Sequence, residues 1–234
     1  MGLEFHWSST AGENGSYVNR LVASSSDLKN STSIARLSTA TGGIVRDITP
    51  EEADARQFEE RLQRGIREGV FLVLLVNPKY YQQACHELCD RFPVKLVDFE
   101  GLFLEALRQV ADKAKVNWDL VLQTDATPHA GDWDKLMLLV GRAMPIVEAQ
   151  LAAMDQTILL IYSGLLARYD QMTMLERLRD CIGRSGGIPG LWLLLPGDQQ
   201  AMIDGKAVPI LSPGQRSRVP ASWLGNRHRA GTVV

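Results

Sequence analysis

The stretch Val70-Phe-Leu-Val-Leu-Leu-Val76, between Gly69 and Asn77-Pro78, decides the fold. Seven apolar residues in an unbroken run are too few to cross a bilayer. The run is also short for a buried helix, and turn-forming residues close both of its ends. Such a run is typical of a strand buried on both faces, and these strands occur in parallel sheets covered by helices. The stretch therefore predicts the central strand of an α/β domain.

The rest of the chain repeats this strand pattern between helical segments. Strands are predicted at Val94–Val97, Thr157–Tyr162 and Leu191–Leu195, with a short edge strand at Val208–Leu211, where proline is tolerated. Helices are predicted over residues 50–69, 79–91, 102–114, 133–153 and around 174–182, with a polar loop over 124–132. The alternation predicts an α/β fold with a mostly parallel sheet of four or five strands and helices on both faces. We describe it as P-loop-like or Rossmann-like, but degenerate.

Composition divides the 234 residues into three segments. Residues 1–49 hold nine Ser and five Thr and little apolar surface, which predicts a poorly structured N-terminal arm. Residues 50–212 form the predicted α/β domain. Residues 213–234 are predicted to be a basic C-terminal tail, because five basic residues face one acidic residue from Asp204 onward. Residues 50–203 carry 16 basic and 22 acidic residues, so the domain itself is acidic.

The chain shows no secretory or membrane signal. Its first residues, Met-Gly-Leu-Glu-Phe-His-Trp, lack the basic and apolar regions of a signal peptide. Three cysteines are an odd and sparse set, which favours free thiols in a reducing compartment. We expect a cytoplasmic protein that does not enter a membrane.

The sequence lacks the elements of a nucleotide-hydrolysing enzyme. A phosphate-binding loop needs glycines, Lys and Ser/Thr, but the turn after the first strand reads Asn77-Pro78-Lys79-Tyr80-Tyr81. The third strand is followed by Tyr162-Ser163-Gly164 and so lacks the acids that would hold magnesium. Protein-kinase motifs are absent as well. The chain is therefore predicted to be non-catalytic, without a cofactor.

Ligands in open α/β sheets bind beyond the carboxyl ends of the strands. That rule points to the residues that follow each strand, and Arg168 is added as a further residue that would line the crevice. Seven candidate ligand-binding residues result, although the strand order decides which of them converge. They are Asn77, Lys79, Asp98, Glu100, Ser163, Arg168 and Asp198. Helix capping is the alternative role for Asp98 and for Ser163.

Two further sets of residues carry weaker signals. Cys85, His86 and Cys89 have ligand-type side chains, but a closed zinc site needs four ligands, so helix packing is the favoured interpretation and no metal is predicted. The tail supplies candidates for contact with nucleic acid or an acidic partner, and the alternative is a solvated chain end. These candidates are Arg216, Arg218, Arg227 and Arg229, together with Lys206 and His228.

Three blocks of the sequence resemble a known family. They are Tyr162–Asp170, Leu175–Asp180 and Gly186–Gly197, and the segments Asp204–Ile210 and Pro220–Leu224 extend them. The blocks resemble the C-terminal region of large Pgl/BREX phage-defence proteins, of the serine/threonine kinase or the ATPase type. The resemblance implies a role in bacterial immunity among the other proteins of a phage-defence system. It supplies no catalytic residue, because the kinase and ATPase motifs of that family match nothing in this chain.

Three functional hypotheses follow. The first is a non-catalytic α/β module that docks a defence protein onto its partners or onto itself as a homo-oligomer. The second is a nucleotide- or phosphoryl-ligand-binding domain with a degenerate P-loop-like site. The third is a domain that contacts DNA or another nucleic acid through the basic tail.

Overall fold

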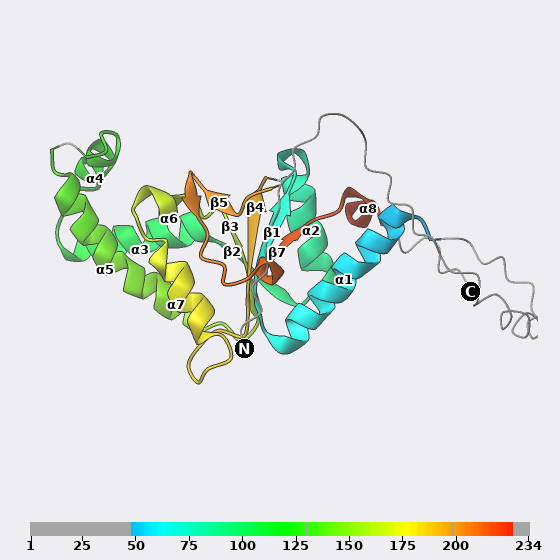
Figure 1. Ribbon diagram of the computed structural model, residues 1–234. Coiled ribbons are helices and arrows are strands. Elements are labelled where there is room, and N and C mark those ends of the chain that lie inside the picture. The colour runs from blue at the N-terminus through cyan, green and yellow to red at the C-terminus, as the bar shows by residue number, and fades with distance from the viewer. Residues whose placement is uncertain (1–47, 130, 198, 227–234) are drawn as a thin grey trace, which may run out of the picture. The chain divides into compact units, whose positions relative to one another are not determined.

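The computed structural model describes residues 48–129, 131–197 and 199–226, which belong to one compact unit, Asp47–Val234. The predicted N-terminal arm lies outside the described residues except for its last two. The unit is built on a five-stranded parallel sheet in the order β2-β3-β4-β1-β7 (Figure 1). Its strands are β1 (Phe71–Val76), β2 (Val94–Asp98), β3 (Thr157–Ile161), β4 (Leu191–Pro196) and β7 (Arg216–Arg218). The α/β prediction is confirmed.

Helices connect these strands, and a small antiparallel hairpin follows β4. The α-helices are α1 (Pro50–Glu68), α2 (Tyr81–Arg91), α3 (Phe99–Lys113), α4 (Trp118–Asp125), α5 (Trp133–Ala152), α6 (Gly164–Arg168), α7 (Thr173–Cys181) and α8 (Ala221–Leu224). Two 3₁₀ turns are η1 (Pro78–Tyr80) and η2 (Pro213–Gln215), and the hairpin pairs β5 (Met202–Ile203) with β6 (Lys206–Ala207).

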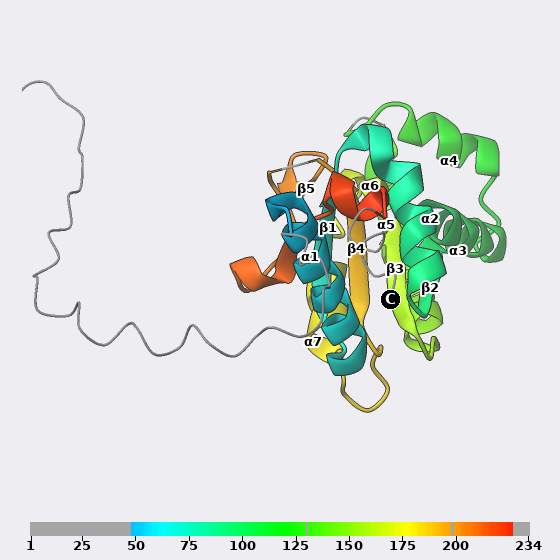
Figure 2. The same ribbon diagram turned by 90° about the vertical axis from the view of Figure 1, so that its right-hand side faces the viewer.

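The helices form two layers, one on each face of the sheet (Figures 1 and 2). Side chains alternate along β1, so Leu72, Leu74 and Val76 pack against α1, α2 and α8. Phe71, Val73 and Leu75 belong to the other core, with α3, α5 and α7. The direction of the crossovers explains the two layers. From β1 the chain crosses to β2 at one edge of the sheet, and it then returns in the opposite direction through β3 and β4. Because crossovers are right-handed, a helix that connects strands in one direction lies on one face, and a helix that connects them in the other direction lies on the opposite face.

Local chemistry fixes both ends of α1. Thr49 accepts a hydrogen bond from the Glu52 N–H at 3.2 Å, and the Glu52 carboxylate accepts one from the Thr49 N–H at 3.1 Å. This capping box satisfies two of the free donors at the helix start. At the other end Gly69 adopts φ +63°, and a Cβ there would collide with the Pro189 carbonyl. A residue without a side chain is therefore required where α1 turns into β1.

The structure differs from the sequence prediction in several elements, and short elements such as α6 and α8 had no predicted counterpart. Helix α3 begins at Phe99, three residues early, because Asp98 caps it. Helix α4 was not predicted, and it occupies part of the expected loop 124–132. The predicted edge strand at Val208–Leu211 is wrong, because the Ile210 N–H bonds to the Val208 carbonyl and closes a tight turn there. Strand β7 takes the edge position beside β1 instead.

Residues 213–226, the described part of the segment expected to be a tail, contribute to both the sheet and the core. Arg216–Arg218 pairs in parallel with Val73–Leu75 of β1. Trp223 on α8 is fully buried, and its ring lies 5.1 Å from that of Phe58 on α1. Burial of so large an aromatic ring outweighs the basic composition of the segment.

Candidate functional site

The turn after β1 is closed by its own hydrogen bonds. The Lys79 N–H donates to the Asn77 side chain at 3.1 Å, and the Tyr80 N–H donates to the Asn77 carbonyl at 2.8 Å. Pro78 has no N–H. The Lys79 ammonium lies over the Tyr80 ring, 4.6 Å from its centroid. These backbone donors are therefore already used in the turn, whereas a phosphate-binding loop presents free amides to its ligand.

Three of the other predicted ligand residues lie away from this turn, and two of them have structural partners. Asp98 accepts a hydrogen bond from the Gly101 N–H at 3.1 Å and caps α3, the alternative role considered for it. Glu100 lies exposed in the first turn of the same helix. The Arg168 Nε donates to the Asp125 carboxylate at 2.9 Å, which ties α6 to α4. Strand β2 is an edge strand, so its carboxyl end lies two strands away from that of β4.

Ser163 is the predicted ligand residue that lines a pocket. We call this cavity of about 430 Å³ the rim pocket; it lies at the carboxyl ends of β1, β3 and β4. It is lined by Pro78, Tyr81, Tyr162, Ser163, Gly164, Leu194, Leu195, Pro196, Met202, Ile203 and Asp204. The Ser163 side chain is buried, and its hydroxyl has no hydrogen-bond partner in the described part of the chain. It occupies the N-cap position of α6 but makes no capping bond.

Sequence reasoning missed Tyr81 and Asp204, which also line the rim pocket. Tyr81 donates to the Leu194 carbonyl at 3.2 Å, and burial is the main cause that raises its pKa to about 12. Asp204 and Gly205 both adopt positive φ and form the turn between β5 and β6. The pair Asp-Gly is a strong hairpin signal and could have located this turn.

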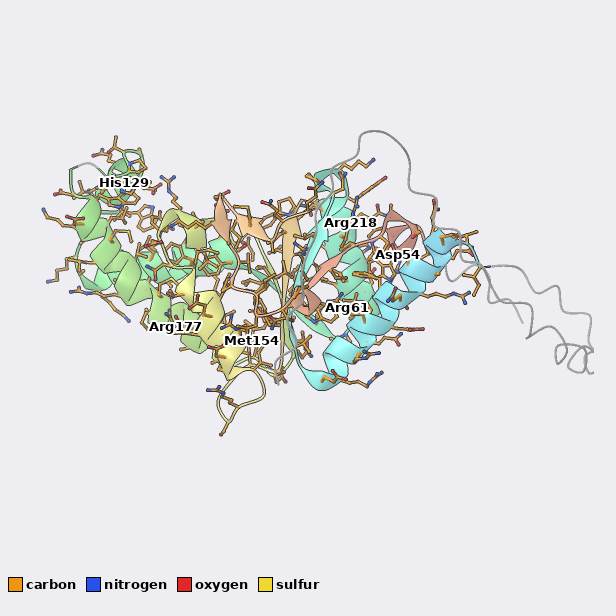
Figure 3. The ribbon with its side chains drawn as sticks, viewed as in Figure 1. Asp54, Arg61, His129, Met154, Arg177 and Arg218 are labelled. Atoms are coloured by element: carbon orange, nitrogen blue, oxygen red, sulfur yellow. The ribbon has the colours of Figure 1, made fainter. Side chains whose placement is uncertain are left out.

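The basic candidates for nucleic-acid contact separate in the structure. Arg216 and Arg218 lie on β7, and Arg216 donates to the Gln199 carbonyl at 2.8 Å (Figure 3 shows Arg218 on this strand). Lys206 pairs with Asp170 at 2.7 Å. Arg227, His228 and Arg229, like the ligand candidate Asp198, lie outside the described residues. Contact with nucleic acid stays a prediction.

A second hollow lies between α4 and α5, and we call it the α4–α5 groove. It has a volume of about 270 Å³, and Val121, Leu136 and Leu139 are buried in it. Leu120 and Leu138 line the same groove with 48% and 66% of their surface exposed. Figures 1 and 2 show α4 at the far end of the helical layer from the sheet. Helix α4, which the sequence did not predict, thus forms one wall of an exposed apolar surface.

Basic side chains border the α4–α5 groove. Arg142 lines it and also lines an adjoining depression together with Lys113. Both side chains are exposed, and neither forms an ion pair within residues 48–129, 131–197 and 199–226. Lys135 is paired with Asp132 at 2.9 Å. Two positive charges without an ion-pair partner among the described residues, those of Arg142 and Lys113, therefore lie beside the groove.

The described residues offer little for metal or thiol chemistry. Among them, no three His, Cys, Asp or Glu side chains are grouped so as to hold a metal ion. Cys85 lies on α2 and packs in the core, and burial is the main cause that raises its pKa to about 11. None of the described helices has the length and apolar character needed to span a bilayer.

Together these features define an α/β domain with a helix-covered parallel sheet, a closed turn where a phosphate-binding loop would lie, and an exposed apolar groove. Among proteins of known name, the chain is 34% identical over 215 residues to the Probable kinase PglW of Streptomyces coelicolor. The alignment covers 85% of this chain and 14% of that protein, so the chain spans about one seventh of its relative's length. The resemblance to a large Pgl-type protein is confirmed. No family model and no solved structure matches the chain.

Proposed function

We propose that this chain is a non-catalytic interaction module of a Pgl-type phage-defence system, which docks onto another protein of that system through the α4–α5 groove. The observation that carries the proposal is a pair of leucines, Leu120 and Leu138, exposed over an apolar groove. Single exposed leucines are common, but a contiguous apolar surface with a concave floor is typical of an interaction site.

The groove indicates the chemistry of its partner. An amphipathic helix can lay its apolar face into a groove between two helices, with anchors spaced three or four residues apart. Arg142 and Lys113 would face the polar border of such a helix. We therefore expect the partner segment to carry acidic residues beside its apolar anchors, because complementary charges fix orientation and speed association.

The turn after β1 supports a non-catalytic role. Its amides bond within the turn, and Lys79 lies over an aromatic ring instead of extending from a glycine loop. Tyr162 and Ser163 follow β3, at the position where an ATPase would have carboxylates. A site built to stabilise a transferring phosphoryl group needs donors and cations aimed at it.

The assignment to a phage-defence system rests on the similarity to PglW. Because the aligned region is a small part of that protein, the module would act beside regions that this chain does not contain. Its partners would be other proteins of the same system or the remaining regions of a PglW-like protein.

Replacement of Leu138 tests the proposal. The Leu138→Glu variant should bind a purified Pgl-system partner about a hundredfold more weakly, because a carboxylate would be buried against apolar side chains. Binding is measured by isothermal titration calorimetry against each purified protein of the system in turn. Leu122→Glu is the matched control: Leu122 is on α4 and 52% exposed, but it does not line the groove.

The outcomes separate clearly. Loss of binding with Leu138→Glu and retention with Leu122→Glu would support docking at the groove. Equal binding by both variants, or binding by neither wild type nor variant across all proteins of the system, would contradict it.

A further inference from the structure

The rim pocket lies where the sheet topology favours a ligand. The segment after β1 enters α2, which covers one face, whereas Ala201, Ile203 and Val208 after β4 belong to the core of the other face. A crevice opens at the carboxyl ends of two adjacent parallel strands when their connections lead to opposite faces of the sheet. Ligands of open α/β sheets bind in this crevice. The pocket of about 430 Å³ lies at this point and has the size of an ordinary small-molecule site.

The walls of the rim pocket are apolar and aromatic. Leu194, Leu195 and Ile203 are buried and contribute aliphatic surface. The rings of Tyr81 and Tyr162 have centroids 5.7 Å apart and line the same wall. The Tyr81 hydroxyl bonds to the Leu194 carbonyl and that of Tyr162 accepts from Gln82, so the ring faces remain as the contact surface. Planar organic groups pack well against such faces.

The charge of the rim pocket is negative. Among its described lining residues there is one carboxylate, Asp204, and no Lys, Arg or His. The Asp204 Oδ2 lies against the backbone just after β3, so close that a Cβ on Gly164 would be 3.2 Å from it. The Asp204 carboxylate forms no hydrogen bond or ion pair within the described ranges. The buried Ser163 hydroxyl next to this backbone also lacks a partner. Asp204 is exposed to solvent, and an unpaired carboxylate at the mouth of an apolar pocket still attracts a cation and repels phosphate, although salt screens both effects.

We propose that the rim pocket binds a small aromatic amine, whose ring packs against Tyr81 and Tyr162 and whose ammonium group pairs with Asp204. The ligand differs in charge from the nucleotide or phosphoryl compound that the P-loop-like sheet suggests. The pocket lies at the sheet rim and shares no lining residue with the α4–α5 groove, so the two proposals are tested independently.

Two probes that differ in the sign of their charge test the proposal. Tryptamine carries a protonated amine on an indole ring, and indole-3-propionate carries a carboxylate on the same ring. Titrated into the full chain and followed by NMR, tryptamine should shift the amide resonances of Ser163, Gly164 and Asp204, and indole-3-propionate should leave them unchanged. Asp204→Asn should weaken tryptamine binding about tenfold or more, the loss expected for a charge-assisted hydrogen bond.

The variants are chosen so that folding is preserved. Asp204 has φ +44°, a conformation that asparagine tolerates well, so Asp204→Asn should keep the hairpin. Asp155→Asn is the control, because Asp155 is an exposed acid before the amino end of β3, at the opposite edge of the sheet. Weakening with Asp204→Asn alone supports the proposal. Absence of tryptamine binding at millimolar concentration, equal binding of indole-3-propionate, or equal weakening by Asp155→Asn would overturn it.

Discussion

Trp223 shows how one residue decides the boundary of the folded unit. Its ring is fully buried, its Nε1 donates to Glu59 at 2.9 Å, and the Arg91 guanidinium lies over it at 4.1 Å. Phe58 and Phe92 pack around it. The side chain thus joins α8 to α1 and α2, and Val219 and Leu224 pack in the same core.

Replacement of Trp223 should therefore destabilise the whole domain. Trp223→Ala removes a buried aromatic ring and should lower the free energy of unfolding by about 3–5 kcal/mol. Trp223→Phe should cost less, because it retains a ring against Phe58 and loses mainly the bond to Glu59. Urea unfolding followed by circular dichroism measures both. A change below about 1 kcal/mol for Trp223→Ala would mean that α8 does not contribute to the core.

Buried thiol and phenol groups predict a loss of stability at alkaline pH. Burial is the main cause that raises the pKa of Cys85 to about 11 and those of Tyr81 and Tyr169 to about 12. These groups lose their protons at lower pH in the unfolded chain than in the folded one. The folded state therefore binds more protons in this window, and the free energy of unfolding falls as pH rises.

The Cys85→Ala variant isolates one of these groups. The difference in unfolding free energy between the wild type and this variant should be constant up to about pH 9, the ordinary thiol range, and should fall between there and pH 11. Urea titrations at several pH values measure it. A difference that stays constant across this range would show that the Cys85 thiol is not perturbed by burial.

At the scale of residues, the sequence located part of the candidate site. The rule that ligands bind beyond the strand ends pointed to Ser163, which lines the rim pocket, but also to Asp98 and Glu100, which do not. It could not separate them, because convergence depends on strand order, a property of long-range pairing. Asp204 lies eight residues beyond Pro196, the last residue of β4, and reaches the pocket only because a hairpin folds back.

At the scale of elements, the capping box at the start of α1 tests whether local sequence stabilises this helix. Thr49→Ala removes the hydroxyl of the capping box and should lower the free energy of unfolding by about 1 kcal/mol. Thr49→Ser keeps the hydroxyl and should change it little. Thermal or urea unfolding of both variants measures the effect. Equal stability of the Ala and Ser variants would indicate that the capping box contributes nothing in solution.

The elements that sequence reasoning predicted well are those with strong local signals. The strands β1, β3 and β4 are apolar runs between turn residues, and α1 has a proline and acids at its start. Strand β7 has the sequence Arg-Ser-Arg, which carries no apolar strand pattern. It is a strand because it pairs with β1, and this pairing cannot be predicted from local sequence. Helix α4 has only eight residues, and Val121 alone is buried. One buried position in two turns gives no apolar periodicity by which the helix could be predicted.

At the scale of the whole molecule, two surfaces differ in their chemistry. The rim pocket has a carboxylate and aromatic walls, whereas the α4–α5 groove is aliphatic with unpaired basic groups at one end. The first suits a small cation and the second an acidic amphipathic helix. High salt should therefore slow association at the groove, since it screens Arg142 and Lys113.

Hydrogen–deuterium exchange of the chain, alone and with its bound Pgl-system partner, tests docking at the α4–α5 groove most directly. The bound partner should slow exchange in α4 and in the first half of α5, around Leu120 and Leu138, and should leave the rim segment around Ser163 unchanged. Slower exchange confined to the rim segment or to β7, with α4 and α5 unaffected, would rule out docking at the groove.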